Sequence, residues 1–144
     1  MYYQLASLRF ECTQCGACCT GNSSHYVALN QQEAKNICNH LNISEKWFRQ
    51  RYLIKRDGIY FGIKLEKSGH CPFLNSDGLC RIYAVRPMQC QTYPYWPELV
   101  NSRGAWLAEK KRCEGIDRGK QISKAHIKKM LALQKQADSE ESIE

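Results

Sequence analysis

The stretch ECTQCGACCT, residues 11–20, places four cysteines within eight positions. These are Cys12, Cys15, Cys18 and Cys19. The two-residue gaps let a tight turn wrap the backbone around a metal ion, and Gly16 gives that turn conformational freedom. Side chains of neighbouring residues tend to diverge, so Cys18 and Cys19 favour two metal centres over one. The stretch predicts a fold built around bound metal.

The composition indicates one small folded domain. Of the 144 residues, nine are cysteine, 43% are apolar and 24% are charged. No run approaches the roughly 20 consecutive apolar residues that span a bilayer, and the start MYYQLASLRF lacks the features of a signal peptide. We therefore expect a cytoplasmic protein with no membrane partner. Thiols stay reduced in that compartment, so the cysteines are expected to bind metal rather than to form disulfides.

Four further cysteines occur singly in segments rich in turn residues. They are Cys71 in GHCPFL, Cys80 in DGLCRIY, Cys90 in RPMQCQTYPY and Cys113 in KKRCEG. The ninth, Cys38, differs because Ala34, Ile37 and Leu41 share its face of a predicted helix, which makes it a core residue. The other eight thiols form two sets of four, the number that ligates a tetrahedral zinc ion or an iron–sulfur cluster.

The spacing favours iron–sulfur ligation and leaves zinc open. A structural zinc module usually has two Cys-x-x-Cys pairs, whereas this chain has one triple followed by isolated cysteines. A triple with a remote fourth cysteine is closer to iron–sulfur cluster ligation, and Cys71-Pro72 is similar to the Cys-Pro that ends the bacterial ferredoxin motif. The similarity is incomplete, because the fourth cysteine of that motif follows the third after a gap of about three residues.

The expected fold class is α+β, a small irregular metal-stabilised domain with short helices, a β-hairpin and cysteine-rich loops. This single domain covers residues 1–137, and an acidic disordered tail covers 138–144. A short strand, HYVALN, precedes a helix that Asn30 caps and Glu33 closes with a capping box. Asp57-Gly58 predicts the hairpin turn.

Periodicity and capping residues predict four further elements. A short helix follows the cap Ser44 and turns Trp47, Phe48 and Tyr52 toward the core. A helix is possible in CRIYAVRPMQC, residues 80–90, and a strand is expected in RGAWLAEKK, residues 103–111. A final helix begins near Ser123 and buries Ile127, Met130 and Leu131.

Two residue types near the cysteines have alternative interpretations. Of the four histidines, only His70 adjoins a predicted ligand, while His40 and His126 are expected on helix surfaces. Arg86 either stabilises thiolates or an anionic substrate, or it forms a salt bridge at a turn. His25 follows the first cysteine cluster and has no assigned role.

The aromatic run TYPYWP has two interpretations as well. Tyr93, Tyr95 and Trp96 either shield the site from water or pack in the core, and core packing is favoured. The sequence contains no glycine-rich phosphate loop and no Ser-His-Asp or paired-carboxylate arrangement. No catalytic residue is therefore assigned.

The order of the cysteines resembles a known family. FECTQCGACC, then CPFLNSDGLCRIYAVRPMQCQTYPYWP, then RCEG is similar to the YkgJ-type cysteine-cluster proteins, which carry a zinc- or iron-chelating domain with the motif CxxCxxCC. The likeness spans residues 10–115 and includes IYAVRP between Cys80 and Cys90. It implies metal ligation by the same eight cysteines. The resemblance does not imply a particular reaction, because most members of the family have no established role. One related group methylates lysines of flagellin, but its resemblance to this chain is limited to the cysteine portion.

The C-terminal third carries most of the positive charge. Residues 103–135 hold ten basic and three acidic side chains, within a formal net charge of +7. Eight ligating thiolates and two divalent ions would lower that net charge to about +3, so part of the basic excess balances the predicted site.

Three functions remain open from the sequence. The favoured one is a cytoplasmic metal-binding protein acting in redox, metal handling or a maturation step, with a protein or small molecule as partner. The second is a protein-modifying enzyme of the lysine N-methylase type, with the cluster in its active site. The third is a nucleic-acid-binding zinc module, which the acidic tail disfavours.

Overall fold

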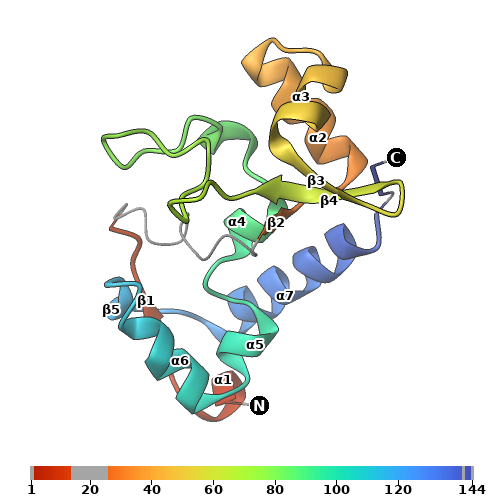
Figure 1. Ribbon diagram of the computed structural model, residues 1–144. Coiled ribbons are helices and arrows are strands. Elements are labelled where there is room, and N and C mark those ends of the chain that lie inside the picture. The colour runs from red at the N-terminus through yellow and green to blue at the C-terminus, as the bar shows by residue number, and fades with distance from the viewer. Residues whose placement is uncertain (1, 14–25, 141, 144) are drawn as a thin grey trace.

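Two hydrophobic cores organise the part of the chain that the computed structural model describes, residues 2–13, 26–140 and 142–143. Short helices and small antiparallel sheets surround these cores, which confirms the α+β fold class. One core lies in the upper half of Figure 1 and the other in the lower half. None of the helices in these residues has both the length and the apolar character needed to cross a membrane.

The first core lies between two helices and a sheet. Helix α2 (Gln31–Leu41) begins with the predicted capping box: the Asn30 side chain accepts a hydrogen bond from the Glu33 N–H, and the Glu33 carboxylate accepts one from the Asn30 N–H. Ser44 caps α3 (Glu45–Tyr52), also as predicted. The two helices bury Ile37, Cys38 and Phe48.

The sheet of the first core has the strand order β2–β4–β3 and is antiparallel. Its strands are β2 (Tyr26–Ala28), β3 (Leu53–Arg56) and β4 (Ile59–Lys64). The predicted hairpin is confirmed, because Asp57 and Gly58 link β3 to β4 with φ angles of 51° and 80°. These are residue types that tolerate the left-handed region, so local sequence sets this turn.

The second core joins the N-terminal segment to the C-terminal third. Strand β1 (Arg9–Phe10) pairs antiparallel with β5 (Ile116–Gln121). Helices α1 (Tyr2–Leu5), α5 (Pro97–Val100) and α6 (Arg103–Lys110) surround the same core. Its most deeply buried side chains are Leu8, Val100, Trp106, Ile116 and Ile127.

Two predictions about local structure are wrong. Residues 103–110 form helix α6, not the strand expected over 103–111. Ser102 caps this helix. Buried Trp106 and half-buried Glu109 are three residues apart and share one face, which is the spacing of a helix rather than of a strand. Trp47, expected in the core with Phe48 and Tyr52, is 54% exposed, whereas Phe48 is buried and Tyr52 half-buried.

Two helices connect the cores. Helix α7 (Lys124–Asp138), capped by Ser123 as predicted, has Ile127 in the second core and runs from the lower to the upper half of Figure 1. Helix α4 (Met88–Thr92) follows a short 3₁₀ turn, η2 (Tyr83–Val85), and packs against α7 and β2. The Thr92 hydroxyl donates a 2.9 Å hydrogen bond to the Gln134 side-chain oxygen, which fixes α4 on α7.

The segment predicted as a disordered tail differs from that expectation at Ile143. The Ile143 carbonyl accepts a hydrogen bond from the Tyr60 N–H at 2.9 Å, and its side chain is 1% exposed within the first core. The acidic composition favours disorder, whereas Ile143 packs in the first core. This contact extends the connection that α7 makes between the two cores.

Replacing Ile143 with Ala should lower the free energy of unfolding by about 2–4 kcal/mol, because the change leaves a cavity in the first core. Ser142→Ala is the matched control, since Ser142 is exposed in the same segment. Chemical denaturation followed by circular dichroism measures both values. If Ile143→Ala is no more destabilising than Ser142→Ala, the segment does not contribute to the core.

Candidate metal centre

Five of the eight predicted ligands lie in the described residues. They are Cys12, Cys71, Cys80, Cys90 and Cys113, whereas Cys15, Cys18 and Cys19 lie outside those residues. Cys71 and Cys113 are 8% and 7% exposed. Cys80 and Cys90 are half-buried, and Cys12 is exposed. Cys71 and Cys80 pack with the first core and Cys113 with the second, so both cores supply thiols.

Cys71 and Cys80 lie in one hairpin-like loop. The Leu74 N–H donates a hydrogen bond to the Cys71 carbonyl at 3.0 Å, and Leu74 forms an antiparallel bridge with Cys80. Nearer the tip, the Asn75 N–H donates to the Leu79 carbonyl at 2.8 Å. Backbone hydrogen bonds within a turn therefore fix these two cysteines against the first core.

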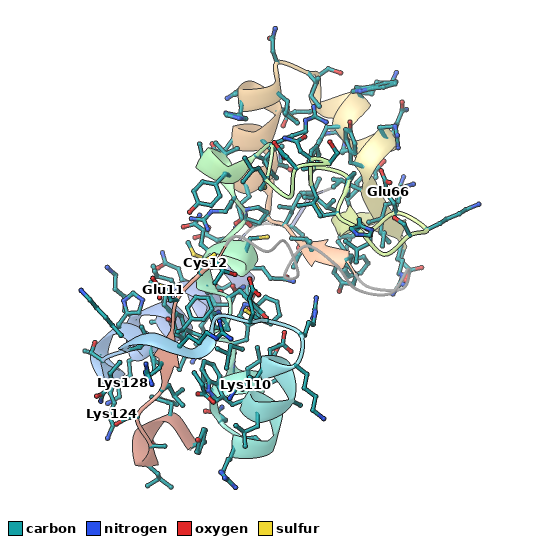
Figure 2. All side chains as sticks on the ribbon, turned by 90° about the vertical axis from the view of Figure 1, so that its left-hand side faces the viewer. Glu11, Cys12, Glu66, Lys110, Lys124 and Lys128 are labelled. Carbon is teal, nitrogen blue, oxygen red and sulfur yellow. The ribbon has the colours of Figure 1, made fainter. Side chains whose placement is uncertain are left out.

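Strand pairing brings the Cys12 segment beside the Cys113 segment. Two hydrogen bonds hold these segments together: the Glu11 N–H donates to the Gly115 carbonyl at 3.0 Å, and the Thr13 hydroxyl donates to the Glu114 carboxylate at 2.5 Å. Cys12 lies between the two contacts in the chain. Figure 2 places it in the middle of the molecule, between the two halves.

Gly115 allows this close approach. A Cβ atom at Gly115 would lie 2.0 Å from the Glu11 carbonyl oxygen and 3.3 Å from the Phe10 ring. The shorter distance is far below van der Waals contact, and its partner is backbone that cannot rotate away. Any side chain at this position must therefore move the Cys12 segment away from Cys113.

The second core contains Cys113 and a buried polar contact. The Tyr93 hydroxyl of this core donates a 2.5 Å hydrogen bond to the Glu109 carboxylate. Burial, followed by the Glu109 hydrogen bond, raises the pKa of Tyr93 well above its ordinary value. The hydroxyl therefore keeps its proton at neutral pH. Arg112 lies 3.5 Å from the same Glu109 carboxylate.

Cys90 lies on α4, between the two cores. At the start of α4, the Met88 N–H donates a hydrogen bond to the Glu33 carboxylate of α2, which ties α4 to the first core. Burial raises the pKa of Glu33, and two backbone hydrogen bonds oppose that shift. The Gln89 side chain accepts a 2.9 Å hydrogen bond from the backbone of β2. These contacts fix the backbone that carries Cys90.

The chemistry of the donors fits thiolate ligation of zinc or iron. Four of the described candidates lie in turns or loops and Cys90 lies within the short helix α4, and all but Cys12 are at least half-buried. Within residues 2–13, 26–140 and 142–143, no three candidate ligands lie close enough together to hold a metal ion. The described cysteines alone do not complete a site, so the predicted set requires the three that lie outside the described residues.

The histidines do not join this arrangement where the structure describes them. His40 and His126 are exposed on helix surfaces, as predicted, and His25 lies outside the described residues. His70 is exposed, and its Nδ1 atom lies 3.2 Å from the Ser68 hydroxyl. Arg86 stacks over the Tyr83 ring at 4.0 Å and donates to the Tyr83 carbonyl, and it forms no salt bridge with any other described residue.

The structure confirms the interpretation of Cys38 and of the aromatic run. Cys38 is 3% exposed in the first core, and burial raises the pKa of its thiol. Tyr93 and Tyr95 are buried in the second core, and half-buried Trp96 packs edge-on against Tyr93. The sequence did not predict the hydrogen bond between Tyr93 and Glu109, because the two residues lie 16 positions apart and no local pattern links them.

The comparison with known proteins matches most of the chain to one family. Residues 11–116 match the family described as "CxxCxxCC: Putative zinc- or iron-chelating domain". The chain belongs to this family. The family's description supports metal binding, with zinc and iron as alternatives.

A curated relative adds no biochemical role. The chain is 29% identical over 100 residues to an uncharacterized protein of Methanocaldococcus jannaschii, which covers 69% of this chain. The matched region is 52% of that relative, so the chain spans about half of the relative's length. No solved structure matches the chain.

Replacing Gly115 with Ala should reduce the metal content and destabilise the protein by about 2 kcal/mol, because the new Cβ atom overlaps the Glu11 backbone. Gly104→Ala is the matched control, since a Cβ there would meet nothing closer than 3.7 Å. That change in α6 should stabilise by about 0.5 kcal/mol and leave the metal content unchanged. Metal analysis and denaturation test both variants. Equal metal content in the two variants would contradict a role for the Cys12 segment.

Proposed function

We propose that the protein is a cytoplasmic metal-binding protein whose eight cysteines hold iron–sulfur or zinc centres, with iron–sulfur favoured, and that it acts in redox, metal handling or a maturation step. The observation that carries this proposal is that buried and half-buried cysteines come from both cores and from the helix between them. Cys71 comes from the first core, Cys113 from the second, and Cys90 from the helix that connects them. A shared metal site explains why cysteines so far apart in the sequence lie in shielded positions.

Metal ligation would also contribute stability that the two small cores lack. Each core is small, and small cores supply only a few kcal/mol of stability without a metal or another cross-link. Structural zinc binding contributes roughly 10–16 kcal/mol in small metal-dependent peptides. We infer that ligation contributes to folding here and holds the two cores in one arrangement.

The choice of iron–sulfur over zinc rests on the sequence spacing. Three cysteines in one segment, joined by cysteines that arrive singly, suit cluster binding better than paired zinc knuckles. An iron–sulfur cluster would supply one-electron transfer, and zinc would supply a redox-inert cross-link. Cys12 is exposed whereas Cys71 and Cys113 are buried, which would give the site one edge that a partner can reach.

Two basic residues near Cys113 are paired with acidic side chains. The Lys110 ammonium lies 3.8 Å from the Asp117 carboxylate, and Arg112 lies 3.5 Å from Glu109. Side chains already paired with acids are less available to phosphates. We therefore propose a protein or small molecule as the partner, in preference to a nucleic acid.

Protein purified without oxygen should be brown and contain iron and acid-labile sulfide. The same preparation exposed to air should lose colour, and zinc can then replace iron because tetrahedral thiolate sites accept both metals. Metal analysis and the visible absorption spectrum of the two preparations give the result. A colourless anaerobic protein with two zinc ions and no iron would contradict the iron–sulfur assignment and leave a zinc-binding protein.

Cys71→Ala should release metal and partly unfold the chain, because binding free energy contributes to folding in small metal domains. Cys38→Ala is the matched control, since both cysteines are buried in the first core. That variant should keep the full metal content and lose about 1 kcal/mol of stability. Loss of one metal equivalent from Cys38→Ala would overturn its assignment as a core residue.

A further inference from the structure

A segment next to two predicted ligands exposes large side chains that the first core does not bury. This segment, residues 79–86, runs through η2 and ends shortly before α4. Leu79 is 47% exposed and Tyr83 is 57% exposed. The segment contains Cys80, and Cys90 follows it on α4. Its exposed side chains are therefore close in the chain to both cysteines.

Arg86, at the end of this segment, is held in place by Tyr83. The guanidinium carbon of Arg86 lies 4.0 Å from the centre of the Tyr83 ring, and its Nε atom donates a 3.1 Å hydrogen bond to the Tyr83 carbonyl. The Arg86 carbonyl accepts a 2.8 Å hydrogen bond from the Gln91 side chain of α4, which fixes the backbone. Because the Arg86 side chain is already ordered, it loses little conformational entropy when it binds a ligand.

The terminal nitrogens of Arg86 remain available to a ligand. Its hydrogen bond to Tyr83 uses the Nε atom, and a guanidinium carries further N–H donors on its two terminal nitrogens. Among the described residues, no acidic side chain forms an ion pair with Arg86. Terminal guanidinium N–H groups match the two oxygens of a carboxylate, so the ordered side chain presents a binding site for such a group.

The surroundings of Arg86 favour a carboxylate of a protein over a phosphate of a nucleic acid. Nucleic-acid binding depends on several basic side chains that neutralise successive phosphates. Here the exposed Asp77 carboxylate accepts a 3.1 Å hydrogen bond from the Leu79 N–H and would repel a phosphate backbone. Exposed Leu79 and Tyr83 need apolar groups to cover them, and tyrosine and arginine are both enriched in protein–protein interfaces.

We propose that residues 79–86 form the docking surface for a protein partner, in which a carboxylate of the partner binds the terminal N–H groups of Arg86 and apolar side chains of the partner cover Leu79 and Tyr83. The inference rests on the proposed function, because it gives the chemistry of the protein partner named there. The Tyr83 N–H donates a 3.2 Å hydrogen bond to the Cys80 carbonyl, so the docked partner lies beside the turn that carries a predicted ligand.

A fluorescein-labelled peptide of alternating glutamate and leucine tests this proposal, with its binding to the full-length protein, purified without oxygen, measured by fluorescence anisotropy. Arg86→Ala should weaken binding on the order of tenfold, as the loss of a charged hydrogen-bond donor does. Arg86→Lys should weaken it as well, because lysine keeps the charge but lacks the planar pair of donors. Arg56→Ala is the matched control, since it removes the same charge from an exposed position on β3, and it should leave the affinity unchanged.

Three outcomes would overturn the docking surface. One is equal peptide affinity in the wild-type protein, Arg86→Ala and Arg56→Ala, which would show general charge attraction. Another is equal binding of a peptide with glutamine in place of glutamate, which would exclude the carboxylate. The third is random-sequence duplex DNA that binds more tightly than the peptide at physiological salt and loses its binding in Arg86→Ala, which would assign the surface to a nucleic acid.

Circular dichroism first establishes that each variant folds. If neither Arg86 variant folds, Tyr83→Ala decides, because this exposed ring can be removed without opening the core. Weaker peptide binding by Tyr83→Ala then supports the proposal, and unchanged binding overturns it.

Metal analysis of the same preparations separates this inference from the proposed function. A wild-type protein that carries iron or zinc and does not bind the peptide overturns the docking surface and leaves the metal-binding function. A wild-type protein that binds the peptide through Arg86 but contains neither metal supports the docking surface and overturns the proposed function.

Discussion

Ligation by cysteines from two separate cores is the constraint on which this account of the structure depends. Cys71 and Cys80 are held by a turn against the first core, while Cys113 is buried in the second. A metal that binds thiolates from both cores would link them with bonds much stronger than the contacts either core makes alone. An irregular fold would suit such ligation, because turns rather than a large sheet would present the cysteines.

The protein contacts that position the cysteines also connect the cores. Helix α4, which carries Cys90, is tied to the first core through Glu33 and to α7 through Thr92. Helix α7 begins in the second core, and Ile143 beyond it is buried in the first. The arrangement of the cysteines is therefore supported by α4 and α7 as well as by any metal. The hydrogen bond from Tyr93 to Glu109 lies at the end of α4, because Tyr93 directly follows that helix.

Local signals in the sequence were sufficient for the elements they control directly. The capping box of Asn30 and Glu33, the Asp57-Gly58 turn and the core position of Cys38 all depend on neighbouring residues. The signals failed where distant contacts decide the outcome. Residues 103–110 are a helix whose cap Ser102 is a local signal and whose Trp106 is buried in the second core, while Ile143 is buried because β4 supplies its hydrogen-bond partner Tyr60. The sequence lists the candidate cysteines, but it does not indicate that Cys71 and Cys113 belong to different cores.

Hydrogen–deuterium exchange of the metal-loaded and metal-free protein tests the central claim most directly. If metal joins the two cores, its removal should speed exchange in both, in α2 of the first core and in α6 and β5 of the second, because each core then opens without the other. Peptide-resolved mass spectrometry gives the exchange of each segment. Faster exchange confined to the cysteine-bearing loops, with α2, α6 and β5 protected as before, would show that the cores are stable without the metal and would contradict this account.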